Sequence, residues 1–192
     1  MGVRAVFLVG FMASGKTTVG EELARRLGWD FVDLDSAIEA RERQTIAEIF
    51  RDSGESKFRI VEASTLGELT DALARDTVIA LGGGTFANPE NRELLRQWPS
   101  IFLEAPTEEL WKRSMKDAGK RPLRKDVLAE FATLYEQRRP FYREATVTIV
   151  TSGKDPASLC AEIESILQIW GKTDSSGTAQ NHSARFETGE SQ

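Results

Sequence analysis

The residues with the clearest chemical role lie near the amino terminus. The segment from Gly10 to Thr17 reads GFMASGKT and fits the pattern G-x-x-x-x-G-K-[ST], which is typical of a phosphate-binding loop. In such a loop, backbone N–H groups surround phosphate oxygens, and the amino terminus of the next helix adds a positive end. We expect Lys16 to reach the β- and γ-phosphates of a nucleoside triphosphate and the Thr17 hydroxyl to hold Mg²⁺.

The segments on either side of this loop are those that the motif requires. Residues 3–9 predict a buried parallel strand, and residues 18–27 are apolar at helical spacing and end at Gly28. A glycine-rich turn that fits the pattern by chance is the alternative, but such a turn needs neither element. We expect the nucleotide to contact Gly10, Ala13, Ser14, Gly15, Lys16, Thr17 and Thr18.

Two carboxylates follow at the end of the second predicted strand, residues 30–35. Asp33 and Asp35 are two residues apart, so their side chains would share one face of a strand. Open α/β sheets bind ligands at the carboxyl ends of their strands. One carboxylate could help to hold hydrated Mg²⁺, and the other could accept a proton from a substrate hydroxyl. The alternative is a solvated strand end at which Asp35 caps the next helix.

Three consecutive glycines, Gly82, Gly83 and Gly84, follow the apolar strand predicted at 78–81. Three glycines cost backbone entropy and offer no packing. We therefore interpret them as a place where a ligand approaches the backbone closely. The alternative is a tight turn, for which one or two glycines are enough.

Basic residues cluster in the second half of the chain, at Arg121, Arg124, Lys125, Arg138, Arg139 and Arg143. Charged helix faces are usually solvated, and this is our interpretation for Arg124, Lys125 and Arg143. Residues 116–125 are charged and contain two helix breakers, which predicts a loop. Arg121 precedes a proline in this loop, as suits a lid that closes over phosphates.

The order of the predicted elements indicates the fold class. Strands are expected at 3–9, 30–35, 78–81, 101–104 and 146–150, and helices at 18–27, 36–43, 45–52, 58–73, 88–98, 107–113, 126–140 and 155–170. Alternating strands and helices predict an α/β three-layer sandwich with a five-stranded parallel sheet. We expect one domain over residues 1–170, with a lid at about 115–126, and a polar, disordered tail over 171–192.

Composition excludes several classes of function. The net charge of −5 disfavours non-specific binding to nucleic acid. The single cysteine, Cys160, rules out an intramolecular disulfide framework and suits a reducing cytosol. The single histidine, His182, falls in the predicted tail, so we expect no histidine-based catalysis or metal site. No apolar run approaches membrane-span length and no leader peptide is evident, so we expect a cytoplasmic protein without membrane contacts.

Taken together, the motifs resemble the shikimate kinase family, within the nucleoside-monophosphate-kinase-like group of phosphate-loop proteins. The likeness runs from about residue 3 to residue 170. Beyond the phosphate-binding loop, it rests on the order and spacing of Leu34-Asp35, Ile38-Glu39, Phe50, Gly54-Glu55, Phe58-Arg59, Glu62, Gly82-Gly83-Gly84, Arg121-Pro122-Leu123, Arg138-Arg139-Pro140-Phe141-Tyr142 and Glu144-Ala145.

The resemblance implies a role for each matching residue. Asp33 would assist Mg²⁺ binding through water beside Thr17, and Asp35 would contact the shikimate hydroxyls and act as the base. Arg59 and Arg138 would hold the shikimate carboxylate, while Gly82, Gly83 and Gly84 would border the same pocket. Arg121 would come from the lid onto phosphate and substrate. Arg113 and Pro156 would enclose the adenine.

The resemblance also implies the reaction, which is ATP-dependent phosphorylation of the 3-hydroxyl of shikimate in chorismate and aromatic amino-acid biosynthesis. ATP and shikimate would be its only partners. We expect a monomer, because the sequence shows no exposed apolar stripe. The alternatives are a related kinase acting on gluconate or a nucleoside monophosphate, and a non-catalytic nucleotide-binding protein. Three features depart from the family pattern: Ala13 in place of a glycine, Arg124 in place of an apolar residue, and a lid about one residue longer.

Overall fold

A computed structural model describes the backbone of residues 4–116 and 127–173, with side chains over 4–115 and 127–170. The predicted lid from residue 117 onward, including Arg121, lies outside the described residues. The predicted tail lies outside them beyond residue 173. None of the described helices is both long enough and apolar enough to cross a membrane.

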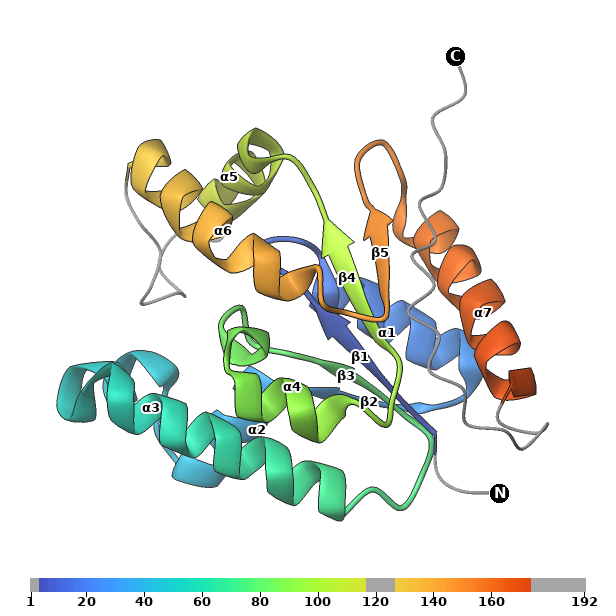
Figure 1. The fold of residues 1–192 in the computed structure, drawn as a ribbon. Coiled ribbons are helices and arrows are strands. Elements are labelled where there is room, and N and C mark those ends of the chain that lie inside the picture. Colours follow the sequence, from blue (N-terminus) through green and yellow to red (C-terminus); the bar gives the residue numbers. More distant parts are fainter. Residues whose placement is uncertain (1–3, 117–126, 174–192) are drawn as a thin grey trace.

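The centre of the molecule is a parallel sheet of five strands, as the sequence predicts. The strands are β1 (Ala5–Val9), β2 (Asp30–Asp33), β3 (Thr77–Ala80), β4 (Ser100–Glu104) and β5 (Val147–Val150). Their order across the sheet is β2-β3-β1-β4-β5 (Figure 1). The register aligns both Asp33 of β2 and Leu8 of β1 with Ala80 of β3. The segments that follow β1, β2 and β3 therefore leave the sheet at the same edge.

Helices cover both faces of this sheet, which gives three layers (Figure 1). The described helices are α1 (Lys16–Leu27), α2 (Leu34–Glu42), α3 (Ile46–Asp71), η1 (Thr85–Ala87), α4 (Pro89–Leu95), α5 (Thr107–Lys116), α6 (Leu128–Tyr142) and α7 (Pro156–Thr173). Alternate residues of β1 point to opposite faces. Val6 and Leu8 pack with α1 and α7, whereas Phe7 packs in the larger core that includes residues of α2, α3 and α6.

The end of β2 differs from the prediction. The strand ends at Asp33, and Asp35 lies in the first turn of α2 rather than on the strand. The cause is local, because Asp33 Oδ1 accepts a 3.2 Å hydrogen bond from Ser36 N and so caps the helix. The two carboxylates consequently do not share a strand face, and Asp33 rather than Asp35 is the capping residue.

Other element boundaries also differ. The break predicted at Gly54 appears as a kink inside α3, where Gly54 has φ 77°. α6 continues through Pro140 to Tyr142, although a stop near the proline was expected. A proline removes one backbone donor, and this is tolerated in the last turn of α6, two residues before its end. α7 continues to Thr173, three residues past the expected helix end.

Candidate active site

The phosphate-binding loop turns sharply between β1 and α1. Gly10 and Gly15 have φ of 150° and 95°, which side chains rarely adopt. A Cβ on Gly10 would also lie 2.8 Å from Ser14 Oγ and 3.0 Å from the carbonyl oxygen of Leu103. Lys16 Nζ donates hydrogen bonds of 2.9 Å to the carbonyl oxygens of Gly10 and Phe11. The ammonium group is therefore held against the loop that would surround a phosphate.

Ala13, in the phosphate-binding loop, adopts a left-handed conformation with φ 62°. This conformation costs a residue with a Cβ about 1–2 kcal/mol. The neighbouring Ser14 side chain is buried, and its hydroxyl has no hydrogen-bond partner among the described residues. Strain and an unpartnered donor at one loop suit a site that binds a ligand.

Thr17 and Asp33, the two residues predicted to serve a metal ion, lie in direct contact. The Thr17 hydroxyl donates a 2.8 Å hydrogen bond to Asp33 Oδ2. A hydroxyl and a carboxylate are hard oxygen donors, which suit Mg²⁺, and Mg²⁺ commonly takes its remaining ligands from water and phosphate. The described part of the chain contains no group of three His, Cys, Asp or Glu side chains that would form an all-protein metal site. The donor set therefore fits Mg²⁺ held together with a nucleotide.

Asp35 reaches the triglycine segment from α2. A Cβ on Gly82 would lie 2.6 Å from Asp35 Oδ1, so the carboxylate occupies the space that a side chain would need. This contact explains physically why residue 82 lacks a side chain. Asp35 also lines the same cavity as the phosphate-binding loop. The structure thus brings the predicted base and the predicted phosphate site together.

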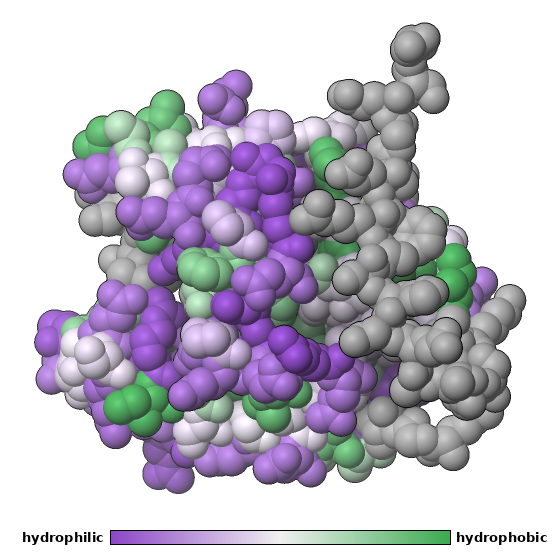
Figure 2. Space-filling view, in the orientation of Figure 1, coloured by the Kyte–Doolittle hydropathy of each residue, from purple (hydrophilic) through white to green (hydrophobic). Residues whose placement is uncertain are grey.

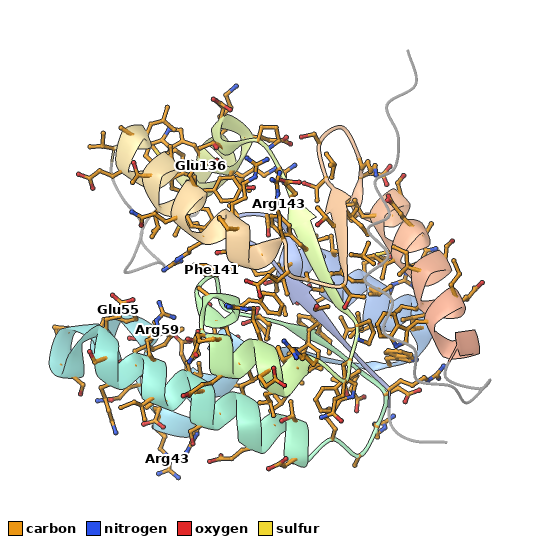
Figure 3. The ribbon with its side chains drawn as sticks, in the orientation of Figure 1. Arg43, Glu55, Arg59, Glu136, Phe141 and Arg143 are labelled. Atoms are coloured by element: carbon orange, nitrogen blue, oxygen red, sulfur yellow. The ribbon has the colours of Figure 1, made fainter. Side chains whose placement is uncertain are left out.

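The two arginines predicted to hold a carboxylate flank the triglycine segment. A Cβ on Gly84 would lie 2.6 Å from Arg59 Nη1. On the other side, Arg138 Nη1 donates a 3.2 Å hydrogen bond to the carbonyl oxygen of Gly83, which also accepts one from the Tyr142 hydroxyl. Figure 3 shows Arg59 beside Glu55 on the side of α3 that faces α6. The guanidinium groups approach the triglycine segment from α3 and α6.

The charge of Arg59 is stabilised by two acidic neighbours. Arg59 Nη1 lies 2.8 Å from Glu62 Oε2, and Nη2 lies 3.0 Å from Glu55 Oε1. Burial lowers the pKa of Arg59, but the two carboxylates outweigh it and the pKa is raised. Burial raises the pKa of Tyr142, so its hydroxyl stays protonated and acts as a donor. The site therefore presents cationic and neutral donors.

One cavity of about 970 Å³ joins most of these groups. The predicted site residues that line it are Ala13, Ser14, Gly15, Lys16, Thr17, Thr18, Asp33, Asp35, Gly83, Arg113 and Pro156. Five others do not line it and lie beside or beneath it: Gly10, Arg59, Gly82, Gly84 and Arg138. Figure 2 shows hydrophilic residues gathered across the middle of one face, between α6 and the α3–α4 side.

Arg113 is tied to the loop after β5. It forms an ion pair with Glu109, whose Oε2 accepts a 2.6 Å hydrogen bond from the Ser152 hydroxyl. The hydrogen bond from the Ser152 hydroxyl lowers the pKa of Glu109, and the positive charge of Arg113 lowers it further. Burial opposes both effects but is smaller than that of Ser152. Arg113 and Pro156, both predicted to contact adenine, line the same cavity.

Sequence reasoning missed several residues of this region. Thr85 directly follows the triglycine segment and its hydroxyl bonds Glu62. Tyr142 bonds Gly83, and the buried Thr151 lines the cavity with a hydroxyl that has no partner among the described residues. The position of Thr85 after three glycines was a usable signal, whereas the other two contacts depend on distant segments.

Comparisons with known proteins identify the family of this chain. The family model described as shikimate kinase matches residues 12–168. The chain belongs to the shikimate kinase family. A shikimate kinase of Persephonella marina is 40% identical over 162 residues, covering 84% of this chain and 97% of that protein. The predicted family is therefore confirmed over nearly all of the predicted domain.

Solved structures support the same family. The shikimate kinase of Acinetobacter baumannii, solved in complex with shikimate, matches with a TM-score of 0.80 and 35% identity, covering 86% of this chain and 93% of that one. A gluconokinase of Sinorhizobium meliloti matches with a TM-score of 0.57 and 18% identity, covering 88% and 94%. The second likeness shows only that the shikimate kinase family shares its fold with other small-molecule kinases.

Proposed function

We propose that this protein transfers the γ-phosphoryl group of ATP to the 3-hydroxyl of shikimate, giving shikimate 3-phosphate and ADP. This step belongs to chorismate and aromatic amino-acid biosynthesis. The observation that carries the proposal is that Asp35 and the phosphate-binding loop line one cavity. Family membership adds the acceptor, because the relatives are named shikimate kinases.

The residues of this chain divide the work of phosphoryl transfer. Lys16 and the loop amides would hold the β- and γ-phosphates, and Asp35 would accept the proton of the attacking hydroxyl. Thr17 and Asp33 would hold Mg²⁺, Asp33 through water. When bound, the ion would neutralise part of the charge on the phosphates. Arg121, outside the described residues, would add a cation from the lid.

The acceptor would lie against the triglycine segment. A carboxylate taken out of water requires charged donors of matching geometry, and a guanidinium supplies two parallel N–H groups. Arg59 and Arg138 stand on either side of Gly83 and Gly84, where they would hold the shikimate carboxylate. Arg113 and Pro156 would enclose the adenine. We propose that the enzyme acts as a cytoplasmic monomer.

One assay tests the proposal against its alternatives. ADP release is measured with ATP and Mg²⁺ in the presence of shikimate, gluconate, a nucleoside monophosphate, or no acceptor. Only shikimate is expected to support turnover, and Lys16→Met is expected to abolish it while circular dichroism stays unchanged. If only gluconate or only a nucleoside monophosphate supports turnover, that compound is the acceptor and shikimate is not. If no acceptor supports turnover, a nucleotide-binding protein without kinase activity is favoured.

A further inference from the structure

Glu62 on α3 is a buried carboxylate whose two oxygens have different partners. Its side chain is 1% exposed. Oε2 accepts a 2.8 Å hydrogen bond from Arg59 Nη1, and Oε1 accepts a 2.6 Å hydrogen bond from the Thr85 hydroxyl. A buried charge is tolerated when it is paired and its oxygens are satisfied. Thr85 therefore completes the environment of the carboxylate that pairs with Arg59.

Thr85 is itself held in place through its backbone. Its residue is 0% exposed, its N–H donates to the Gly82 carbonyl at 3.2 Å, and its carbonyl accepts from Asn91 Nδ2 at 3.0 Å. With the main chain anchored to α4 and to the triglycine segment, the hydroxyl points at Glu62. The 2.6 Å length is typical of a hydroxyl bonded to a carboxylate, the stronger class of hydrogen bond.

The Thr85–Glu62 pair lies between the predicted base and the predicted carboxylate-binding arginine. The position of a Cβ on Gly82 is 2.6 Å from Asp35 Oδ1, 2.9 Å from Thr85 Oγ1 and 3.0 Å from Glu62 Oε1. The same carboxylate holds Arg59 beside Gly84. A shift of Glu62 is thus passed directly to the guanidinium that would meet the acceptor.

We propose that Thr85 is a positioning residue for acceptor binding, in which its hydroxyl fixes Glu62 and Glu62 fixes Arg59 against Gly84. This inference rests on the proposed function. If the hydroxyl is removed, Glu62 Oε1 is left buried without a donor. The Glu62 carboxylate then turns so that both of its oxygens accept hydrogen bonds from Arg59. The carboxylate of the acceptor must then compete with Glu62 for the guanidinium group.

The test compares Thr85→Val, Thr85→Ser and a matched control, Thr77→Val, by steady-state kinetics and thermal unfolding. Thr77 is also buried in the core, at the opposite end of β3, and its hydroxyl bonds the carbonyl of Arg75 at 2.7 Å. Thr85→Val is expected to raise KM for shikimate about tenfold or more. The kcat and the KM for ATP should stay within about twofold, and Thr85→Ser should restore KM. Thr77→Val should change stability only.

Several results would overturn the inference. These are an unchanged KM for shikimate in Thr85→Val, an equal rise in KM for both substrates, or no rescue by serine. If Thr85→Val does not fold, Thr85→Ala and Glu62→Gln must show the same selective rise in KM for shikimate, or the inference fails. If the wild type does not turn over shikimate, the proposed function itself is wrong. If the wild type turns over shikimate but Thr85→Val leaves KM for shikimate unchanged, only the role of Thr85 is wrong.

Discussion

The Thr17 hydroxyl donates a 2.8 Å hydrogen bond to Asp33 Oδ2, linking the first turn of α1 to the end of β2. The same carboxylate caps α2 through its other oxygen, which accepts from Ser36 N at 3.2 Å. Asp33 therefore has a structural and a proposed metal-binding role at once. The two roles depend on different properties, because capping needs an oxygen acceptor whereas Mg²⁺ binding gains from the negative charge.

Asp33→Asn separates these roles. Asparagine caps helices as well as aspartate does, so the melting temperature should change little. Loss of the charge should raise the Mg²⁺ concentration needed for half-maximal activity by about tenfold. Activity is measured against Mg²⁺ at saturating ATP, with Ser36→Ala as a control, since Ser36 is exposed and lines the same cavity. An Mg²⁺ requirement unchanged in Asp33→Asn would remove this residue from the metal site.

Asp35→Asn should lower kcat/KM for shikimate by about 10²–10⁴, the usual contribution of a positioned proton acceptor. The KM for ATP should stay within a few-fold, because Asp35 lies against Gly82 on the proposed acceptor side of the shared cavity and is not part of the phosphate-binding loop. Glu39→Gln is the matched control. Glu39 lies one turn later on α2, lines the same cavity, and accepts a hydrogen bond from Ile46 N at 2.9 Å. Equal losses in the two variants would mean that Asp35 is not a specific base.

Ala13→Gly should stabilise the fold. The left-handed backbone at φ 62° strains alanine by about 1–2 kcal/mol, and glycine removes that strain at some cost in unfolded-chain entropy. We expect a net gain of about 1 kcal/mol, or a melting temperature higher by about 2–4 °C. Ala40→Gly, at an exposed position in α2, should lower it instead. A lower melting temperature in Ala13→Gly would show that the loop holds Ala13 without strain.

The extent to which the sequence predicted this structure depends on how local each feature is. The strand–loop–helix around Lys16 was predicted correctly because the motif and its flanks are contiguous. The prediction that Asp35 shares a strand face with Asp33 was wrong, because the capping contact of Asp33 ends the strand before Asp35. The contact of Arg138 with Gly83 joins residues 55 positions apart, so only the family resemblance pointed to it. The place of Thr85 directly after three glycines was visible in the sequence, but its hydrogen bond to Glu62 joins residues 23 positions apart, which no local pattern reveals.

Cys160 should be chemically inert in the folded protein. Its side chain is fully buried, and its Sγ donates to the carbonyl of Val19 at 3.6 Å. Burial raises the pKa of the thiol from 9.0 to about 11. A thiol reagent at pH 8 should therefore leave the native protein unmodified and modify one thiol per chain after denaturation.

The same shift gives a pH dependence of stability. The folded state disfavours the thiolate, so the contribution of Cys160 is complete below pH 9 and is lost as the pH rises through about 11. Thermal unfolding between pH 8 and pH 11 should show a steeper fall for the wild type than for Cys160→Ala. Identical slopes, or rapid modification of the native thiol at pH 8, would contradict the burial of this residue.

Arg138 offers the sharpest test of acceptor recognition. Its Nη1 donates to the Gly83 carbonyl at 3.2 Å, and its guanidinium carbon lies 5.9 Å from the centre of the Phe11 ring. Breaking a charge-assisted pair that is closed off from water costs on the order of 2–5 kcal/mol. Arg138→Ala should therefore raise KM for shikimate strongly and leave KM for ATP within a few-fold. Arg143→Ala, which removes an exposed arginine beyond the end of the same helix, should change neither.

A second substitution and a second acceptor show which group of the acceptor Arg138 recognises. Arg138→Lys keeps the charge but lacks the paired N–H groups, so KM for shikimate should still rise if the interaction with the carboxylate is bidentate. An analogue of shikimate without the carboxylate should be a poor acceptor for the wild type. In Arg138→Ala and in Arg59→Ala, most of the preference for shikimate over this analogue should disappear, because each variant lacks one of the two guanidinium groups that would hold the carboxylate. If the wild type phosphorylates the analogue as well as shikimate, the two arginines do not recognise the carboxylate, and their contacts with the triglycine segment serve the structure alone.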